Sequence, residues 1–284
     1  MRFGVFLPNF GPFGEVDALV QLATAAEASG WDGFFIWDHI ALGEADERPI
    51  ADPWVALTAV AAMTKSLRIG TAITPLARRR PWKLARETAT LDRFARGRLT
   101  LGVGLGYPPD AEFGRFGEET DDRVRADKLD EGLEVLRGLW SGERFDFEGE
   151  HYRISDARFD TPYEASTVPV WCGGWWPNRR PFRRAARWDG VIPEMVGGAT
   201  PSPDHVREIR DYIARHRSQM HDFDVVINGY TDGAGDTRTG DYEQAGVTWW
   251  LERFDTSRLY SFEEALERIE AGVPGGGSQA GDKS

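Results

Sequence analysis

Short apolar runs alternate with amphipathic stretches from one end of the chain to the other. Eight of these runs are candidate strands, and most of them are almost continuously apolar, which is typical of parallel strands that are covered on both faces. The eight predicted strands are residues 3–10, 33–39, 67–74, 98–104, 168–172, 190–195, 224–230 and 247–254.

Helical patterns lie between the predicted strands, with apolar side chains recurring every three or four residues. In residues 202–217 this spacing places Val206, Ile209 and Ile213 on one face. Strand-then-helix units in regular succession predict an α/β fold of the (β/α)₈ TIM-barrel type. An open dinucleotide-binding sheet fits less well, because residues 11–14 lack the full glycine fingerprint that follows the first strand of such sheets.

One interval between strands is longer than the others. About 70 residues separate the starts of the fourth and fifth predicted strands. Within this interval, residues 108–122 predict a long loop, and residues 144–163 predict an excursion that contains a short hairpin about Gly149. We therefore expect a single barrel domain over residues 1–271, with an insertion between strands 4 and 5, and a flexible tail over residues 272–284.

The composition is that of a globular protein with a sizeable core, since 41% of the 284 residues are apolar and 28% are charged. The net charge is −12 at pH 7, which disfavours nucleic acids and anionic membranes as partners. The single cysteine, Cys172, excludes an intrachain disulfide and a multi-cysteine metal site. No apolar run reaches the roughly 20 residues of a membrane helix and no secretory signal is visible, so the sequence predicts a cytoplasmic protein.

A barrel of this type carries its active site at the carboxyl ends of the strands. Of the five histidines only His39 lies at such an end, so we do not expect a metal site. Glu194 and Glu252 also lie at strand ends and could supply the two acids of a hydrolase, which keeps that class of enzyme open. The polar or unusual residues at the predicted strand ends are Asn9, Asp38, His39, Thr74, Tyr107, Glu194, Asn228 and Glu252.

Two of the predicted strand ends are rich in glycine. Gly104 and Gly106 come at the end of the fourth strand, and Gly173 and Gly174 follow the fifth, just before Trp175 and an arginine-rich helix start. Glycine allows a flat ring or a phosphate to approach the backbone, and a helix N-terminus favours an anion. The same glycines are compatible with tight packing in a barrel and with turn geometry, so the residues alone leave both explanations open.

Over roughly residues 1–270 the chain resembles the luciferase-like monooxygenase superfamily. The resemblance rests on the Asp-His pair that ends the second strand, the GVGxG pattern of the fourth strand, and the glycine-rich fifth strand followed by RRAARWDG. It implies a (β/α)₈ oxidoreductase that uses either the deazaflavin coenzyme F420, which is slightly favoured, or FMN. It also implies a small organic substrate and a homodimer.

The resemblance implies roles for individual residues as well. His39 matches a histidine that lies beside the redox ring and assists proton or hydride transfer, and Asp38 would orient this histidine or hold the local backbone. Ala72 and Ile73 match a non-prolyl cis peptide that forms a bulge behind the ring. Tyr107 stands where some F420-dependent sugar and alcohol dehydrogenases carry a catalytic glutamate, which puts that chemistry in doubt. We expect Tyr107 to donate a hydrogen bond or to stack.

A phosphate-binding loop is the remaining implied element. Gly173, Gly174 and the start of the following helix match this loop, with Arg179 as a charge partner. Arg184, on the same predicted helix, is expected to face solvent or the outside of the barrel. Aromatic residues near the rim, Trp175 among them, predict an apolar cleft for a planar ligand.

The function therefore has one leading interpretation and two alternatives. The leading one is hydride transfer to or from a small organic substrate, or monooxygenation with FMN. A carboxylate-based hydrolase would instead bind no coloured cofactor. A non-catalytic relative would bind a flavin tightly without turning over a substrate.

Overall fold

Eight parallel strands close into a barrel in a computed structural model that describes residues 1–42, 48–163, 167–233, 235–255 and 260–275. The strands follow one another around the barrel in chain order, and the last pairs with the first. They are β1 (Arg2–Leu7), β2 (Gly33–Ile36), β3 (Arg68–Pro75), β4 (Leu99–Gly104), β7 (Val170–Trp176), β8 (Gly190–Met195), β9 (Asp224–Gly229) and β10 (Trp249–Arg253). The predicted (β/α)₈ barrel is confirmed.

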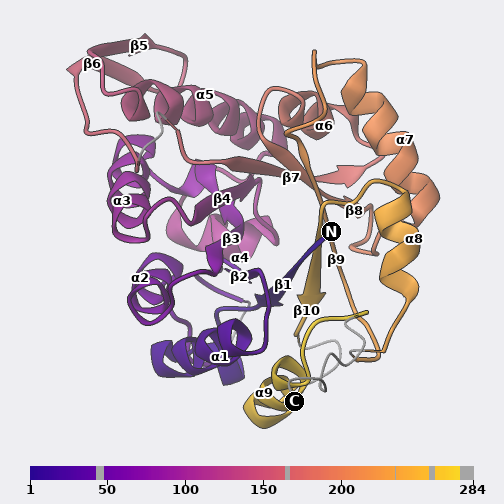
Figure 1. Ribbon diagram of the computed structural model, residues 1–284. Coiled ribbons are helices and arrows are strands. Elements are labelled where there is room, and N and C mark those ends of the chain that lie inside the picture. The colour runs from indigo at the N-terminus through magenta and orange to yellow at the C-terminus, as the bar shows by residue number, and fades with distance from the viewer. Residues whose placement is uncertain (43–47, 164–166, 234, 256–259, 276–284) are drawn as a thin grey trace.

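Helices surround the barrel (Figure 1). The α-helices are α1 (Val16–Ala28), α2 (Pro53–Met63), α3 (Pro81–Phe94), α4 (Pro109–Glu112), α5 (Asp122–Trp140), α6 (Arg179–Ala185), α7 (Pro203–Ala214), α8 (Arg238–Gln244) and α9 (Phe262–Glu270). Short 3₁₀ helices are η1 (Gly11–Phe13), η2 (Leu76–Arg78) and η3 (Gly114–Phe116). Helix α9 packs against α1, which closes the ring of helices (Figure 1).

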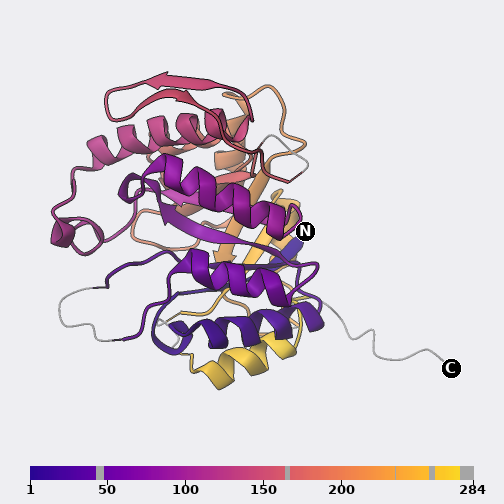
Figure 2. The same cartoon turned by 90° about the vertical axis from the view of Figure 1, so that its left-hand side faces the viewer.

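The predicted hairpin in the insertion is confirmed. Strands β5 (Phe145–Glu148) and β6 (Arg153–Ala157) pair antiparallel about Gly149 and lie along α5 (Figure 2). The predicted long loop before α5 is only partly a loop, because α4 and η3 form within it. Pro109 starts α4, where its missing N–H and fixed φ suit the first turn of a helix.

Among the strand boundaries that differ from those predicted from the sequence, two affect the candidate site. Strand β7 continues to Trp176, so that Gly173 and Gly174 lie within it and pair with β8 instead of following the strand. The glycines suggested a turn, but the neighbouring strand supplies a full set of backbone partners. Strand β2 ends at Ile36, so Asp38 and His39 lie just beyond it. Both differences keep these residues at the carboxyl end of the barrel.

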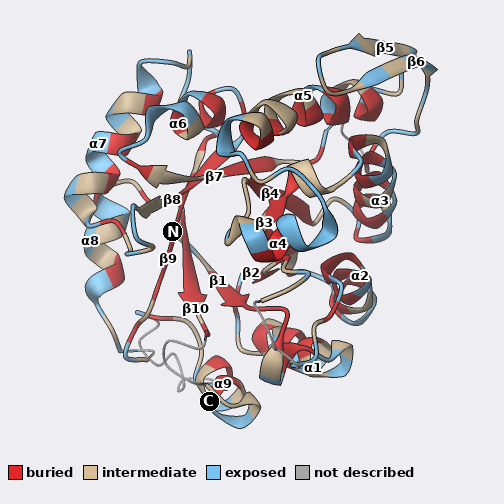
Figure 3. Ribbon diagram, turned by 180° about the vertical axis from the view of Figure 1, so that it is seen from behind, coloured by how far each residue is buried: buried red, intermediate tan, exposed pale blue. Residues whose placement is uncertain are grey.

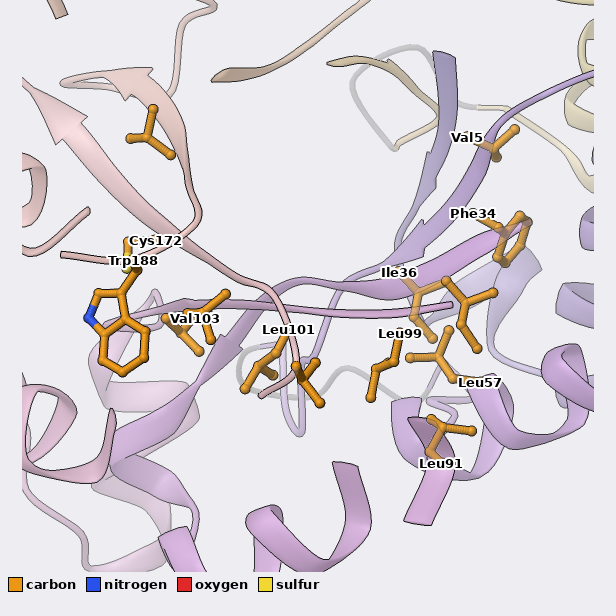
Figure 4. Close-up of a cluster of buried hydrophobic side chains, with 14 of the residues drawn as sticks. Val5, Phe34, Ile36, Leu57, Leu91, Leu99, Leu101, Val103, Cys172 and Trp188 are labelled. Atoms are coloured by element: carbon orange, nitrogen blue, oxygen red, sulfur yellow. The ribbon is translucent and has the colours of Figure 1, made fainter. Parts of the chain in front are cut away.

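The hydrophobic core has an outer and an inner layer. The outer layer lies between the strands and the helices, whose buried faces turn toward the barrel (Figure 3). Figure 4 shows Leu57 of α2 and Leu91 of α3 beside Leu99 of the barrel. In the inner layer, Phe35 has its ring centroid 5.0 Å from that of Trp171. These large rings pack inside the barrel, below the carboxyl ends of its strands.

Cys172 belongs to the outer layer. Its side chain is buried beside Val103 and Trp188, on the side of β7 that faces the helices (Figure 4). Burial raises the pKa of its thiol to about 12, so the sulfur is protonated at neutral pH. Cys172 therefore contributes to packing rather than to the chemistry of the barrel mouth.

Within the described residues, no helix is long and apolar enough to cross a membrane. The predicted tail, residues 272–284, falls for the most part outside the described residues, which end at position 275. Helix α9 ends at Glu270, just before this tail. The single domain over residues 1–271 stays a prediction.

Candidate active site

A pocket of about 490 Å³ opens at the carboxyl ends of the barrel strands. Its volume lies within the range of roughly 300–1,000 Å³ that is usual for small-molecule sites. All of the residues predicted for the site except Arg179 line this pocket. Those that do are Asp38, His39, Ala72, Ile73, Gly104, Gly106, Tyr107, Gly173, Gly174 and Trp175.

The floor of the pocket is formed by a bulge in β3. The Ala72–Ile73 peptide is cis, as predicted, and the pairing of β3 with β4 shifts register at this point. A Cβ added at Gly104 would lie 2.8 Å from Cδ1 of Ile73, and one added at Gly173 would lie 3.1 Å from its Cγ2. The two glycines therefore leave room for the Ile73 side chain. The result is an apolar floor against which a flat ring can lie.

His39 is held by a carboxylate that the sequence did not single out. Its Nδ1 lies 2.7 Å from Oε1 of Glu112, which is fully buried at the end of α4. Because Nδ1 is engaged by Glu112, Nε2 is the ring nitrogen left for a ligand. The segment around Glu112 suggested only a loop, and its one sequence signal is an acid between Ala111 and Phe113.

Two arginines connect this pair to Asp38. Arg78 bonds Glu112 and also donates from Nη2 to Oδ1 of Asp38 at 2.6 Å. Arg79 donates from Nη2 to both carboxylate oxygens of Asp38, at 2.7 and 2.8 Å. Among the described contacts, Glu112 rather than Asp38 bonds the His39 ring. Asp38 holds the arginines, and its backbone oxygen accepts a further bond from Arg78.

The surroundings keep His39 neutral. Burial and the positive charge of Arg78 lower its pKa to about 4, against the weaker opposing effect of Asp38. A neutral imidazole has one protonated nitrogen. With the Glu112 carboxylate as acceptor, that proton sits on Nδ1, which leaves Nε2 of this pocket-lining residue as the proton acceptor.

Two buried arginines line the pocket, although the sequence did not predict a position there for either of them. Arg125 is 1% exposed, and its Nη1 donates to the Leu105 oxygen at 2.6 Å. Its Nε has no hydrogen-bond partner within the described part of the chain. Arg184, expected to face outward, is instead buried and lines the pocket, because Asp130 of α5 accepts a 2.6 Å bond from its Nε and draws it inward.

Arg179 does not reach the pocket. Its guanidinium carbon lies 3.9 Å from the centre of the Trp176 ring and 4.7 Å from that of Tyr212, on the outer side of β7. Stacking on two aromatic faces holds an arginine away from the strand end. The arginine that lies at the pocket from helix α6 is therefore Arg184.

The part of the lining that β8, β9 and β10 supply is polar and acidic. Glu194 accepts hydrogen bonds from Nε1 of Trp175 at 3.2 Å and from Nδ2 of Asn228 at 3.4 Å. Arg253 lies beside them, with its Nη1 3.3 Å from Oδ1 of Asn228. Tyr107 is 63% exposed at the mouth, with its ring 5.5 Å from that of Trp175.

Glu252 does not line the pocket. It is fully buried, and its carboxylate accepts bonds from the backbone N–H and the hydroxyl of Thr231, both at 2.9 Å, and from Nε1 of Trp250 at 3.0 Å. Its oxygens are thus occupied by structural donors. Glu194 and Glu252 do not form a pair of acids facing one ligand, which removes the support for a hydrolase.

Comparison with known sequences identifies the family to which the chain is similar. A family model described as luciferase-like monooxygenase matches residues 1–270. An F420-dependent glucose-6-phosphate dehydrogenase of Nakamurella multipartita is 37% identical over 238 residues, which is 80% of this chain and 66% of that protein. A protein of the same name from Mycolicibacterium smegmatis is 36% identical over 55% of this chain and 47% of its own length. The chain thus spans about half to two thirds of the length of these relatives.

Solved structures share the fold. An F420-dependent secondary alcohol dehydrogenase in complex with an F420-acetone adduct superposes with a TM-score of 0.75 at 19% identity, over 95% of this chain and 98% of that one. The monooxygenase RslO1 from Streptomyces bottropensis gives a TM-score of 0.72 at 22% identity, over 95% and 97% of the two chains. At these identities the likeness concerns the barrel alone.

Proposed function

Because the chain belongs to the luciferase-like monooxygenase family, we propose that it is an oxidoreductase that binds a flavin-type cofactor at the barrel mouth and transfers hydride between this cofactor and a small organic substrate. The observation that carries the proposal is His39, which lines the same pocket as the apolar floor at Ile73 and whose Nε2 has no partner among the described contacts. F420 is favoured over FMN, because the curated relatives described above are named as F420-dependent enzymes.

The residues of the pocket fit such a cofactor. Ile73 offers an apolar surface to a ring, and Gly104 and Gly173 keep that surface free of other side chains. The buried guanidinium groups of Arg125 and Arg184, which also line the pocket, suit the phosphate that FMN and F420 both carry. The unpartnered Nε of Arg125 is a donor that such an anion could engage.

The cofactor would supply the hydride chemistry, and the chain supplies binding, orientation and a proton acceptor. His39 accepts a proton at Nε2 as hydride leaves a substrate hydroxyl carbon, because its imidazole is neutral. Glu112 holds the ring and its tautomer in place. Phe6 and Trp37, whose rings lie 5.7 Å apart, line the pocket and exclude water from it.

Cofactor titration tests the proposal. We expect purified protein to change the fluorescence of F420 on binding, and to bind F420 more tightly than FMN in a parallel titration. Heat-denatured protein is the control for nonspecific quenching. If neither cofactor binds, the proposed function is wrong. Tight binding combined with no turnover of any alcohol or carbonyl would favour a non-catalytic flavin-binding protein.

We also propose that the protein forms a homodimer through α2. A helix that is apolar on all sides is normally buried, and α2 has the sequence PWVALTAVAAM. Yet Val55 is 62% exposed and Met63 61% exposed. The same helix of a second copy would cover these side chains with its own apolar side chains.

Light scattering tests the dimer. We expect a mass of about twice the 31.8 kDa of one chain at micromolar concentration. The substitutions Val55→Glu and Met63→Glu, made together, should reduce it to that of one chain, because a buried unpaired carboxylate is costly. Ala214→Glu, on the exposed side of α7 across the barrel (Figure 1), is the matched control. A wild-type mass near 32 kDa would contradict the proposal.

A further inference from the structure

A chain of buried charged side chains is bonded to the His39 ring. Arg78 donates to Glu112 and, at 2.6 Å, to Oδ1 of Asp38, and Arg79 donates to the same Asp38 carboxylate. The side chain of Glu112 is 0% exposed, that of Asp38 1% and that of Arg78 7%. With both acids ionised, the two arginines and the two acids have a net charge of zero. The neutral imidazole at the end of the chain leaves this sum unchanged.

We propose that Arg78 is the positioning residue that keeps Nε2 of His39 free of a proton at neutral pH. The inference deepens the proposed function, and it rests on that function only for the use that a reaction makes of this nitrogen. The form of the ring itself can be measured in protein without a cofactor.

The charge of Arg78 balances that of Glu112. Among the described contacts Arg78 is the one cation bonded to this carboxylate, whereas the side chain of Arg79 bonds Asp38. The repulsion between Arg78 and a positive ring is also, after burial, the main cause of the lowered pKa of His39. Without Arg78 the buried network would carry a charge of −1. Since burying an unpaired carboxylate is costly, the network would take up a proton from the solvent.

This added proton has two places to go, and both put a proton on Nε2. If His39 takes it, both ring nitrogens carry protons. If Glu112 takes it, its new O–H donates to Nδ1, and the single ring proton then lies on Nε2. Asp38 is a poorer place, because Arg79 still donates to both of its oxygens. Without Arg78, Nε2 therefore changes from an acceptor into a donor.

Other charged side chains around the imidazole do not take the place of this arginine. Arg48 stacks on Phe10, with its guanidinium carbon 5.0 Å from the ring centre, and that of Arg253 lies 5.7 Å from the centre of Trp37. Both aromatic rings pack against the imidazole, but among the described contacts neither arginine bonds the carboxylate at Nδ1. The negative charge of Glu118, between η3 and α5, favours uptake of a proton.

NMR of the imidazole nitrogens in cofactor-free protein tests the inference. Two-bond ¹H–¹⁵N correlations distinguish a protonated ring nitrogen from an unprotonated one, and comparison with His39→Ala protein assigns the signals of His39. At pH 7 we expect the parent protein to have Nδ1 protonated and Nε2 unprotonated. In Arg78→Gln, which removes the charge and keeps a hydrogen-bond donor, Nε2 should be protonated in most molecules. An unprotonated Nε2 in folded Arg78→Gln would overturn the inference, and so would a protonated Nε2 in the parent.

Two further variants separate the charge of Arg78 from its shape. Arg78→Lys keeps the charge and should keep Nε2 unprotonated, so a protonated Nε2 in this variant would contradict the charge argument. Arg80→Gln makes the same change as Arg78→Gln at an exposed neighbour, and as the matched control it should leave the ring as in the parent.

The inference stays testable if Arg78→Gln does not fold. Arg78→Met, which removes the charge and keeps an unbranched apolar stem, should likewise have a protonated Nε2, and an unprotonated one would overturn the inference. The spectrum of the parent protein needs no variant at position 78. Because none of these measurements uses a cofactor, failure to bind F420 or FMN would count against the proposed function alone.

Discussion

Replacing His39 with alanine is expected to lower turnover by roughly 10²–10⁴-fold, the range usual for the loss of general acid–base assistance, while the barrel stays folded. The imidazole lies outside the inner barrel core, beside Trp37 at its edge, and among the described residues only its Nδ1 is engaged. Steady-state kinetics with a substrate that the parent protein turns over would measure the loss, and circular dichroism would verify the fold. His221→Ala, at an exposed side chain, is the control. Unchanged turnover would make His39 a structural residue.

The pH dependence of the same reaction distinguishes a chemical role from a structural one. Burial and Arg78 lower the pKa of His39 to about 4. Since the neutral ring is the proton acceptor, kcat/KM for alcohol oxidation should be constant above that value and fall as the pH drops through about 4. An ordinary histidine would instead lose activity near pH 6.5. In the His39→Ala variant this acidic limb should be absent.

Replacing Gly174 with glutamate is expected to weaken binding of F420 or FMN by at least about tenfold. Gly174 lies in β7 at the edge of the pocket, beside the start of α6. Charge-assisted hydrogen bonds to a phosphate are worth roughly 1.5–3 kcal/mol each. Since about 1.4 kcal/mol corresponds to a factor of ten, the loss of one such bond is sufficient. Fluorescence titration measures the change, and riboflavin, which lacks the phosphate, should be affected less.

A size-matched variant separates charge from bulk at this position. A Cβ at Gly174 would lie 2.3 Å from Cβ of Pro181, so any side chain there must displace the start of α6. Gly174→Gln introduces the same bulk without the charge. We expect it to bind riboflavin as the glutamate variant does and to bind FMN more tightly than that variant. Equal FMN affinity for Gly174→Glu and the parent protein would place the phosphate elsewhere.

The sequence was sufficient for the barrel because its strands are apolar on both faces. That pattern marks parallel strands regardless of what packs beside them, and capping residues such as Asp52 mark helix starts locally. The boundaries of β7 were wrong because its glycines resemble a turn. Whether Gly173 and Gly174 continue a strand depends on the pairing with β8, which is a long-range contact.

The charged residues of the site were harder to identify from the sequence, because their roles also depend on long-range contacts. His39 stands out because it is the only histidine at a strand end. The role of Glu112 depends on its contacts with His39 and Arg78, which are more than 30 residues away along the chain. Arg184 and Arg179 share one short helix, and only the positions of Asp130 and Trp176 decide which of them turns toward the pocket.

Cys172 gives the chain a natural reporter of how often the barrel opens. It is the only sulfhydryl of the 284 residues, and in the folded state it is both protonated and shielded from solvent. A thiol reagent can react only after β7 separates from the helices behind it, so the labelling rate measures the free energy of that separation. The next residue, Gly173, faces the pocket. A ligand that binds in the pocket and stabilises β7 would make this separation rarer. It would therefore slow labelling of the Cys172 sulfur on the other side of the same strand.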